Sequence, residues 1–184
     1  MSKKVSPIPR GYRTATPCLT VTNVDNAVAF YHAAFGAELL TSHAISGSTP
    51  SIHATIKIGN SIIALNQEAP SLNILSAQTS GVSTGQIHLY VTDIEASWNR
   101  AIEAGATVHT PLFDAYWGDR TGMLIDNSGH IWSIASKIEN VSKDEINRRG
   151  RSIFDGTNSA EDATANELPY LVESGLAEHD SPGS

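Results

Sequence analysis

The chain has 184 residues, of which 40% are hydrophobic, and it carries a formal net charge of −7. This length allows one sizeable hydrophobic core or two small fused cores. Seven acidic residues and one basic residue fall between residue 151 and the C-terminus, so the rest of the chain is nearly neutral and has no basic stripe for nucleic acid. The single Cys18 excludes an internal disulfide framework.

Nothing in the sequence indicates a membrane or secretory segment. No apolar run approaches the about 18 residues that a membrane span needs. The opening residues MSKKVSPIPRGY have two lysines but no apolar segment behind them. We therefore expect a cytoplasmic protein that contacts neither membranes nor nucleic acid and whose partner is a small molecule.

Two segments of the chain resemble each other at a fixed separation. LTVTNVDNAVAFYHAAFGAEL begins at Leu19, and LYVTDIEASWNRAIEAGATV begins at Leu89. Each predicts a strand followed by a helix that ends at a glycine, and Asp25 and Asp93 are placed to cap the two helices. Two copies of one supersecondary unit are the simplest explanation.

Three more strands are predicted after the glycine of each copy. In chain order, the first copy has strands at 14–21, 37–42, 53–58 and 61–65, and the second has strands at 86–91, 107–110, 122–125 and 131–136. The sequence therefore predicts an α+β fold in which two βαβββ units, at about 12–66 and 86–137, form curved mixed sheets with helices outside. The polar connection at 66–85 is long enough to be a lid or a disordered loop.

The C-terminal part follows this body of residues 12–137, which forms one domain. We expect a helix at 138–152 and an acidic tail at 153–184. The composition of the tail is typical of a disordered segment. The alternative is that it docks on the body or on a second subunit through its apolar residues Leu168, Tyr170, Leu171 and Leu176.

Strict alternation assigns two faces to the first strand of each copy. Gln86, His88 and Tyr90 share a polar face opposite apolar neighbours that should pack on the helices. The first strand repeats this pattern, and its polar face carries Thr16, Cys18 and Thr20. In the segment IDNSGHIWSIAS, Ser133 shares the polar face, whereas His130 shares the parity of Trp132 and is interpreted as structural.

The repeated units, together with FYHAAFGAE and DNSGHIWSI, resemble the vicinal oxygen chelate superfamily of glyoxalases, bleomycin resistance proteins and dioxygenases. The segment YWGDRTGMLIDNSGHIWSIAS, followed by NVSKDEINRR, is similar to the glyoxalase-like branch named after phosphonate-utilisation operons. The resemblance implies a half-open sheet in each unit. In metal-dependent members it also implies a divalent ion held by four side chains from the first and last strands.

This resemblance places the four ligand positions at Thr16, Ala64, Gln86 and Ser133. Only Gln86 could ligate, and neutral oxygens hold a first-row divalent ion less well than histidine or carboxylate. We therefore expect a degenerate metal site and no metal cofactor. A shift of the alignment by two residues brings His88 to a ligand position, so one divalent metal bound through His88 remains an alternative.

The segment PLFDAYWGDRTG is rich in aromatic residues and is expected to be a loop. Tyr116 and Trp117 could stack on a planar ligand, and Arg120 could pair with an anion. The alternative is that Asp119 and Arg120 pin the loop while Trp117 fills a gap. The candidate ligand-binding residues are Thr16, Cys18, Thr20, His53, Gln86, His88, Tyr90, Tyr116, Trp117, Arg120 and Ser133, and the candidate catalytic residues are His88 and Tyr90.

Two classes of function follow from these residues. The first is a small-molecule-binding protein that holds an apolar or aromatic metabolite for resistance or sequestration. The alternative is an enzyme of specialised metabolism, a lyase, isomerase or dioxygenase-like protein, that works without a metal or with a divalent metal at His88. Because the half-open sheets and the aromatic segment need cover, we also expect a homodimer.

Overall fold

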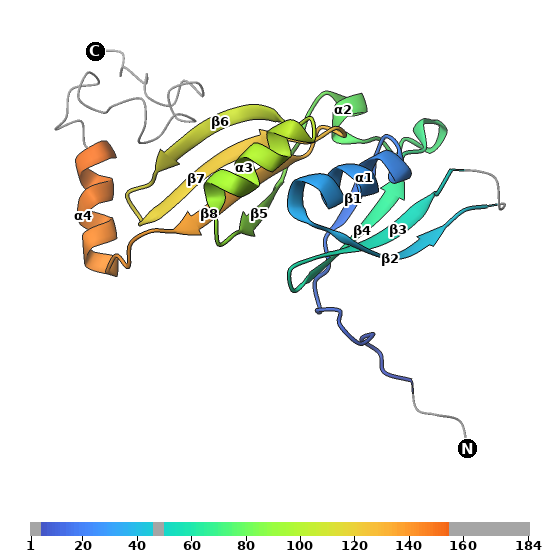
Figure 1. Ribbon diagram of the computed structural model, residues 1–184, viewed down its shortest axis with the longest axis horizontal. Helices are drawn as coiled ribbons and strands as arrows, with labels where there is room; N and C mark the ends of the chain where they lie inside the picture. The colour runs from blue at the N-terminus through green and yellow to red at the C-terminus, as the bar shows by residue number, and fades with distance from the viewer. Residues whose placement is uncertain (1–4, 46–49, 155–184) are drawn as a thin grey trace, which may run out of the picture. The chain divides into compact units, whose positions relative to one another are not determined.

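The computed structural model describes residues 5–45 and 50–154. It confirms an α+β fold with two four-stranded mixed sheets (Figure 1). The described residues divide into two compact units, one of residues 5–45, 50–86, 96–107 and 125–131, and one of residues 87–95, 108–124 and 132–154. The first repeat lies within the first unit, whereas the second repeat contributes to both.

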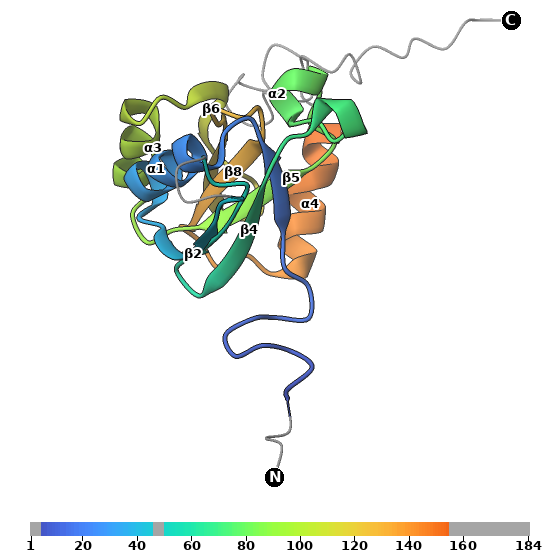
Figure 2. The ribbon, with the colours of Figure 1, turned by 90° about the vertical axis from the view of Figure 1, so that its right-hand side faces the viewer.

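The first sheet contains the four strands of the first repeat in the order β1-β4-β3-β2. Strand β1 (Cys18–Val21) runs parallel to β4 (Ser61–Gln67), and β3 (His53–Ile58) runs antiparallel to both β4 and β2 (Glu38–His43). Helix α1 (Val24–Phe35) packs on one face of this sheet (Figure 2). The strand that begins the first repeat is therefore shorter than the predicted 14–21, because residues 14–17 precede β1.

The N-cap of helix α1 is Asn23 and not the predicted Asp25. The side chain of Asn23 accepts a hydrogen bond of 2.8 Å from the backbone N–H of Asn26, and Asp25 lies in the first turn, where its charge favours the helix N-terminus. The helix ends at Gly36 in the left-handed conformation. Its buried face consists of Val24, Ala27, Phe30, Tyr31 and Ala34.

The second sheet has the strand order β5-β8-β7-β6. Its strands are β5 (Gln86–Tyr90), β6 (Thr107–Asp114), β7 (Asp119–Ile125) and β8 (Ile131–Lys137), and helix α3 (Ile94–Glu103) follows β5 in the chain. The order βαβββ therefore occurs twice, as the repeat predicts.

The C-terminal helix α4 spans Lys143–Phe154, several residues later than predicted. The hydroxyl of Ser142 accepts a hydrogen bond of 3.2 Å from the N–H of Glu145, so the chain caps the helix at Ser142. Among residues 5–45 and 50–154, no helix is long and apolar enough to cross a membrane. The acidic tail lies outside the described residues from position 155 onward.

The connection after β4 is folded, so the expectation of a disordered loop is wrong. It contains the short helices η1 (Pro70–Leu72) and α2 (Ala77–Ser80) and an antiparallel bridge between Ala69 and Ile74. The carboxylate of Glu68 accepts a hydrogen bond of 3.0 Å from the N–H of Ser76, and bonds to Ser76 and Thr79 lower the pKa of Glu68. These local hydrogen bonds take the place of the hydrogen bonds between paired strands, which this segment lacks.

The turn between β7 and β8 is held by Asp126. Its Oδ1 accepts hydrogen bonds from the backbone N–H groups of Ser128 at 2.8 Å and His130 at 2.9 Å. A side chain at Gly129, which has a φ of 85°, would meet the backbone of residues 77 and 78. The His130 ring lies 3.4 Å from Asp126 Oδ2, which agrees with a structural role for His130.

The aromatic segment forms a β-hairpin rather than a loop, because β6 extends to Asp114 and β7 begins at Asp119. The N–H of Gly118 donates to the carbonyl of Ala115 at 2.8 Å and closes the turn. Gly118 has a φ of 88°, and a Cβ there would collide with the carbonyl oxygen of Glu139. The turn therefore requires glycine for both its conformation and its close packing.

Candidate functional site

The polar face of the first sheet carries three of the predicted ligand-binding residues. Cys18 lies opposite Ala64 in the β1–β4 register, Thr20 lies opposite Asn66, and Asn66 lies opposite His53. Because partners across a ladder point to the same side, these side chains share one face. Thr16 precedes β1, and its hydroxyl donates to the carbonyl of Arg13 at 3.3 Å.

A chain of hydrogen bonds joins three strands on this face. The Nδ1 atom of His53 lies 2.7 Å from Oδ1 of Asn66, and Nδ2 of Asn66 donates to the sulfur of Cys18 at 2.9 Å. His53 also stacks against His43, with ring centroids 6.0 Å apart. Sequence reasoning overlooked Asn66 because the predicted strand stopped at Leu65. Extending the alternation from Ala64 by one step would have placed Asn66 on the polar face.

The polar face of β5 follows the predicted alternation. Gln86, His88 and Tyr90 are exposed, whereas Ile87 and Leu89 are half-buried. The Nδ1 atom of His88 lies 2.9 Å from the hydroxyl of Ser133 on β8. The rings of His88 and Tyr90 meet edge to face, with centroids 4.7 Å apart. The structure therefore brings together His88, Tyr90 and Ser133, and it leaves Nε2 of His88 directed away from its Ser133 contact.

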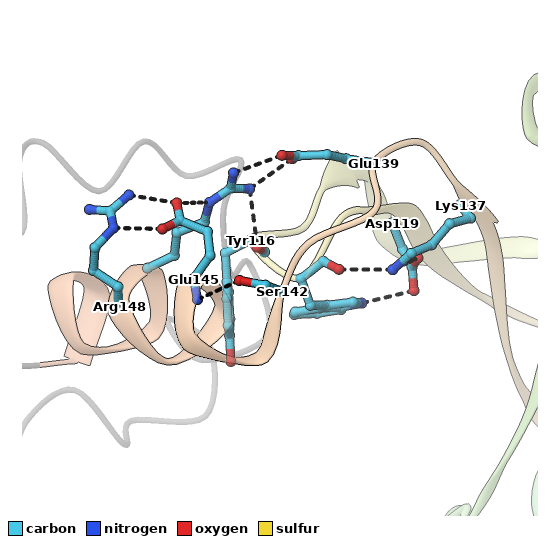
Figure 3. A network of polar contacts seen from close by, with 9 residues as sticks. Tyr116, Asp119, Lys137, Glu139, Ser142, Glu145 and Arg148 are labelled. Atoms are coloured by element: carbon cyan, nitrogen blue, oxygen red, sulfur yellow. Dashed lines mark hydrogen bonds and ion pairs between the residues drawn. The ribbon is translucent and has the colours of Figure 1, made fainter.

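A buried carboxylate organises the aromatic residues next to this face (Figure 3). Oδ2 of Asp119 accepts hydrogen bonds from the Tyr90 hydroxyl at 2.9 Å and from Nε1 of Trp117 at 3.0 Å. Oδ1 accepts no hydrogen bond from the described residues but lies 3.1 Å from Nζ of Lys137, whose ammonium also donates to the carbonyl of Trp117. Asp119 is 2% exposed, so the lysine compensates a charge that burial would otherwise disfavour.

The hydrogen bond from Tyr90 to Asp119 raises the pKa of the Tyr90 phenol, and burial adds to this effect. The phenol therefore keeps its proton near neutral pH and donates it in the hydrogen bond to Asp119. Tyr90 offers a ligand the lone pairs of its oxygen and the face of its ring. This arrangement disfavours Tyr90 as a base and suits it to accept a hydrogen bond.

Helix α4 covers part of the aromatic hairpin (Figure 3). The guanidinium of Arg149 binds both carboxylate oxygens of Glu139 at 2.8 Å, reaches Glu145 at 2.8 Å and donates to the carbonyl of Tyr116 at 3.4 Å. A Cβ at Gly150 would lie 3.4 Å from the Tyr116 ring, so the helix backbone approaches that ring closely. Tyr116 in turn packs edge to face on Trp117 at 5.0 Å.

Arg120 forms ion pairs within the chain. Its guanidinium lies 2.7 Å from Glu95 and 2.8 Å from Asp114, and these two carboxylates raise its pKa. Arg120 therefore pairs with Glu95 and Asp114 and not with Asp119, as one interpretation of the sequence suggested. The sequence analysis considered Asp119 only as a partner of Arg120 and did not single out Lys137, because the contacts of both residues depend on pairing across strands.

The resemblance places the four metal-ligand positions of the superfamily at residues that fit a divalent ion poorly. They hold Thr16, Ala64, Gln86 and Ser133, which supply no histidine and no carboxylate. Within residues 5–45 and 50–154, no group of three or more histidine, cysteine, aspartate or glutamate side chains could hold a metal ion.

Residues 13–134 match the model of the Glyoxalase/Bleomycin resistance protein/Dioxygenase superfamily. The chain belongs to this superfamily. An uncharacterized protein of Mycobacterium bovis, Mb0911c, is 36% identical over 149 residues, which cover 77% of this chain and 94% of the relative.

Two solved structures have a fold similar to that of this chain. TioX from Micromonospora sp. ML1 is 25% identical, covers 71% of this chain and 100% of its own, and has a TM-score of 0.53. The product of the Arabidopsis thaliana gene AT5G48480 is also 25% identical, covers 67% of this chain and 98% of its own, and has a TM-score of 0.54.

Proposed function

We propose that this protein is a glyoxalase-like binding protein with a degenerate metal site, which holds an apolar or aromatic metabolite for resistance or sequestration. The observation that carries the proposal is the convergence of Tyr90 and Trp117 on one oxygen of the buried Asp119. Two aromatic rings fixed in this way provide contact area at low cost in conformational entropy. We also propose that the chain belongs to the glyoxalase-like branch named after phosphonate-utilisation operons. The similarity of YWGDRTGMLIDNSGHIWSIAS to that branch supports this assignment.

The charges near these rings favour a ligand without a net negative charge. Lys137 is paired with Asp119, and Arg120 is paired with Glu95 and Asp114. An anionic ligand would have to displace a carboxylate that is already in place. The groups that remain for recognition are the Tyr90 oxygen, which can accept, and the His88 ring, which can accept or donate. We therefore propose a planar, uncharged ligand with at least one hydrogen-bond donor.

Titration of the protein with a panel of uncharged planar aromatic metabolites, followed by tryptophan fluorescence and calorimetry, tests the proposal. For a ligand that binds, Trp117→Ala should weaken binding by about 1–3 kcal/mol, the range of base–aromatic stacking and of interface truncations. The matched control is His109→Ala, which changes an exposed histidine of β6 that bonds only to its neighbour Thr110 among described residues. Equal affinity of wild type and of the Trp117 and His88 variants would contradict the proposed site.

The second function is a metal-independent enzyme, and the contact between His88 and Ser133 favours it. Ser133 holds one ring nitrogen, so the other could transfer a proton to or from a ligand seated on the aromatic rings. Product analysis of every compound that binds distinguishes the two functions. Turnover that disappears in His88→Gln while binding persists would establish the enzyme, whereas binding without any product supports sequestration.

We also propose that the protein forms a homodimer. The aromatic hairpin is partly covered by α4, and exposed apolar residues remain on the edge strand β2, where Leu39 is 51% and Leu40 is 43% exposed. Pairing of such a surface with a second copy would remove it from water. Light scattering at high protein concentration checks this proposal, since a mass near 19.6 kDa alone would contradict it.

A further inference from the structure

Two histidines lie at the end of a row of polar residues that crosses the whole first sheet. Thr20 on β1 lies opposite Asn66 on β4, Asn66 lies opposite His53 on β3, and His53 lies opposite His43 on β2. Directly opposite residues on neighbouring strands have their Cβ atoms about 4.5–5.5 Å apart and point to the same side. The sheet register therefore places the two imidazoles next to each other on the polar face.

Asn66 fixes the proton of His53. Its Oδ1, which can only accept, lies 2.7 Å from Nδ1 of His53, and its Nδ2 is directed to the sulfur of Cys18. With the amide in this orientation, the neutral imidazole of His53 carries its hydrogen on Nδ1 and presents a lone pair at Nε2. Histidines that bind metal ions characteristically donate their other N–H to a carbonyl oxygen or carboxylate in this manner, which sets the tautomer and the ring orientation.

His43 is able to act as the second ligand. It is exposed, and no residue in the ranges 5–45 and 50–154 forms a hydrogen bond with its ring. The rings of His43 and His53 have an interplanar angle of 20° and centroids 6.0 Å apart. Rotation of the exposed His43 side chain can bring its nitrogen toward Nε2 of His53, and both atoms need to approach one ion to about 2.0–2.1 Å.

We propose that His43 and His53 form a binding site for a divalent first-row transition-metal ion such as Zn2+, Ni2+ or Cu2+. Two imidazoles supply borderline ligands that these ions prefer, and water molecules complete the coordination. The site is separate from the positions Thr16, Ala64, Gln86 and Ser133 at which the superfamily would bind its metal. With two protein ligands the ion is exchangeable, so the site fills when metal is supplied and empties with a chelator.

The proposal is independent of the aromatic-ligand function, because its residues belong to the first sheet and its probe is the metal alone. The experiment is a titration of chelator-treated, untagged protein with Zn2+ by calorimetry, repeated with Ni2+. We expect one saturable site per chain in wild type. His43→Ala and His53→Ala should each weaken affinity by at least about 10-fold, the lower end of the losses seen when the support of a metal ligand is removed.

Two further variants make the test specific. Asn66→Leu removes the partner of His53 while it keeps both imidazoles, and we expect it to weaken binding by about 10–100-fold. His109→Ala is the matched control, because it removes an exposed histidine of the second sheet and should leave the affinity unchanged. Circular dichroism before each titration establishes that a variant is folded.

The outcome that overturns the proposal is equally clear. Absence of saturable Zn2+ and Ni2+ binding in wild type, or unchanged affinity in both His43→Ala and His53→Ala, would show that the pair is not a metal site. Because aromatic-ligand binding is measured on the same wild-type protein without metal, a failure of one proposal leaves the result of the other readable.

Discussion

The hydroxyl of Tyr31 on helix α1 donates a hydrogen bond of 2.6 Å to Oδ2 of Asp126, 95 positions further along the chain. Both side chains are buried, and Oδ1 of the same carboxylate holds the turn that begins β8. A residue of the first repeat therefore stabilises the turn of the second repeat. This contact joins two motifs that the sequence presents separately, FYHAAFGAE and DNSGHIWSI.

Replacement of Tyr31 tests the importance of this contact. Tyr31→Phe removes one hydrogen bond to a buried carboxylate and should lower the free energy of unfolding by about 1.5–3 kcal/mol. Chemical denaturation measures the change. The control is Tyr12→Phe, because no described residue forms a hydrogen bond with the half-buried Tyr12 hydroxyl. A change in Tyr31→Phe no larger than that of the control would mean that Asp126 does not depend on the phenol.

Asp119 is expected to control the ionisation of Tyr90. In Asp119→Asn the pKa of the Tyr90 phenol should fall toward the ordinary value of about 10, because the carboxylate that raises it is gone. The raised pKa stabilises the folded protein below the unfolded pKa of tyrosine, and this stabilisation is lost as the pH rises through the folded pKa. Spectroscopic titration of tyrosinate, with Tyr90→Phe to identify the signal, measures the shift. An unchanged titration in Asp119→Asn would exclude the interaction.

The turn glycine of the aromatic hairpin offers a test of close packing. Gly118→Ala introduces both a strained φ and a collision with the carbonyl of Glu139, whereas Gly36→Ala introduces only the strain, since no atom lies within 4 Å of a Cβ there. We expect a loss of about 1–2 kcal/mol for Gly36→Ala and a clearly larger loss for Gly118→Ala. Thermal unfolding of the two variants gives the comparison. Equal losses would show that the turn moves freely away from residue 139.

Docking of helix α4 should depend on Arg149. Arg149→Met removes the bonds to Glu139, Glu145 and the carbonyl of Tyr116, whereas Arg148→Met removes only a bond pair to Glu145. We expect faster hydrogen exchange or proteolysis of residues 143–154 in Arg149→Met, because this exposed network holds the helix on the hairpin. Arg148→Met serves as the control. Identical exchange in the two variants would contradict the assigned role.

The same network predicts how the helix responds to acid. Hydrogen bonds from Arg148 and Arg149 lower the pKa of Glu145 to about 2, and the pKa of Glu139 is lowered by its bonds to Arg149. A depressed carboxyl pKa stabilises the docked helix above the unfolded pKa of about 4.3. We expect docking to be constant from neutral pH to that value and to be lost as the pH falls toward 2. Hydrogen exchange at a series of pH values, corrected for the intrinsic rate, measures this; loss of docking above pH 5 would contradict it.

The sequence by itself determined the repeated βαβββ order and the polar face of β5, because alternation and the internal repeat are local properties of the chain. The expectation of a degenerate metal site also came from the sequence, since it rests only on Thr16, Ala64, Gln86 and Ser133. It misplaced the cap of α1, although the repeat pairs Asn23 with Asp93. Capping depends on where the first helical turn closes, which a propensity for aspartate does not specify.

Only the tertiary structure decided the partners of the polar side chains. Asp119 is adjacent to Arg120 in the sequence, yet it binds Tyr90, Trp117 and Lys137, because neighbouring residues of a strand point to opposite faces. Asn66 likewise became part of the His53 row only when the length and register of β4 were known. Residues far apart in the chain meet through strand pairing. The alternation along one strand says which face each side chain takes, but it does not say which residue of the next strand lies opposite.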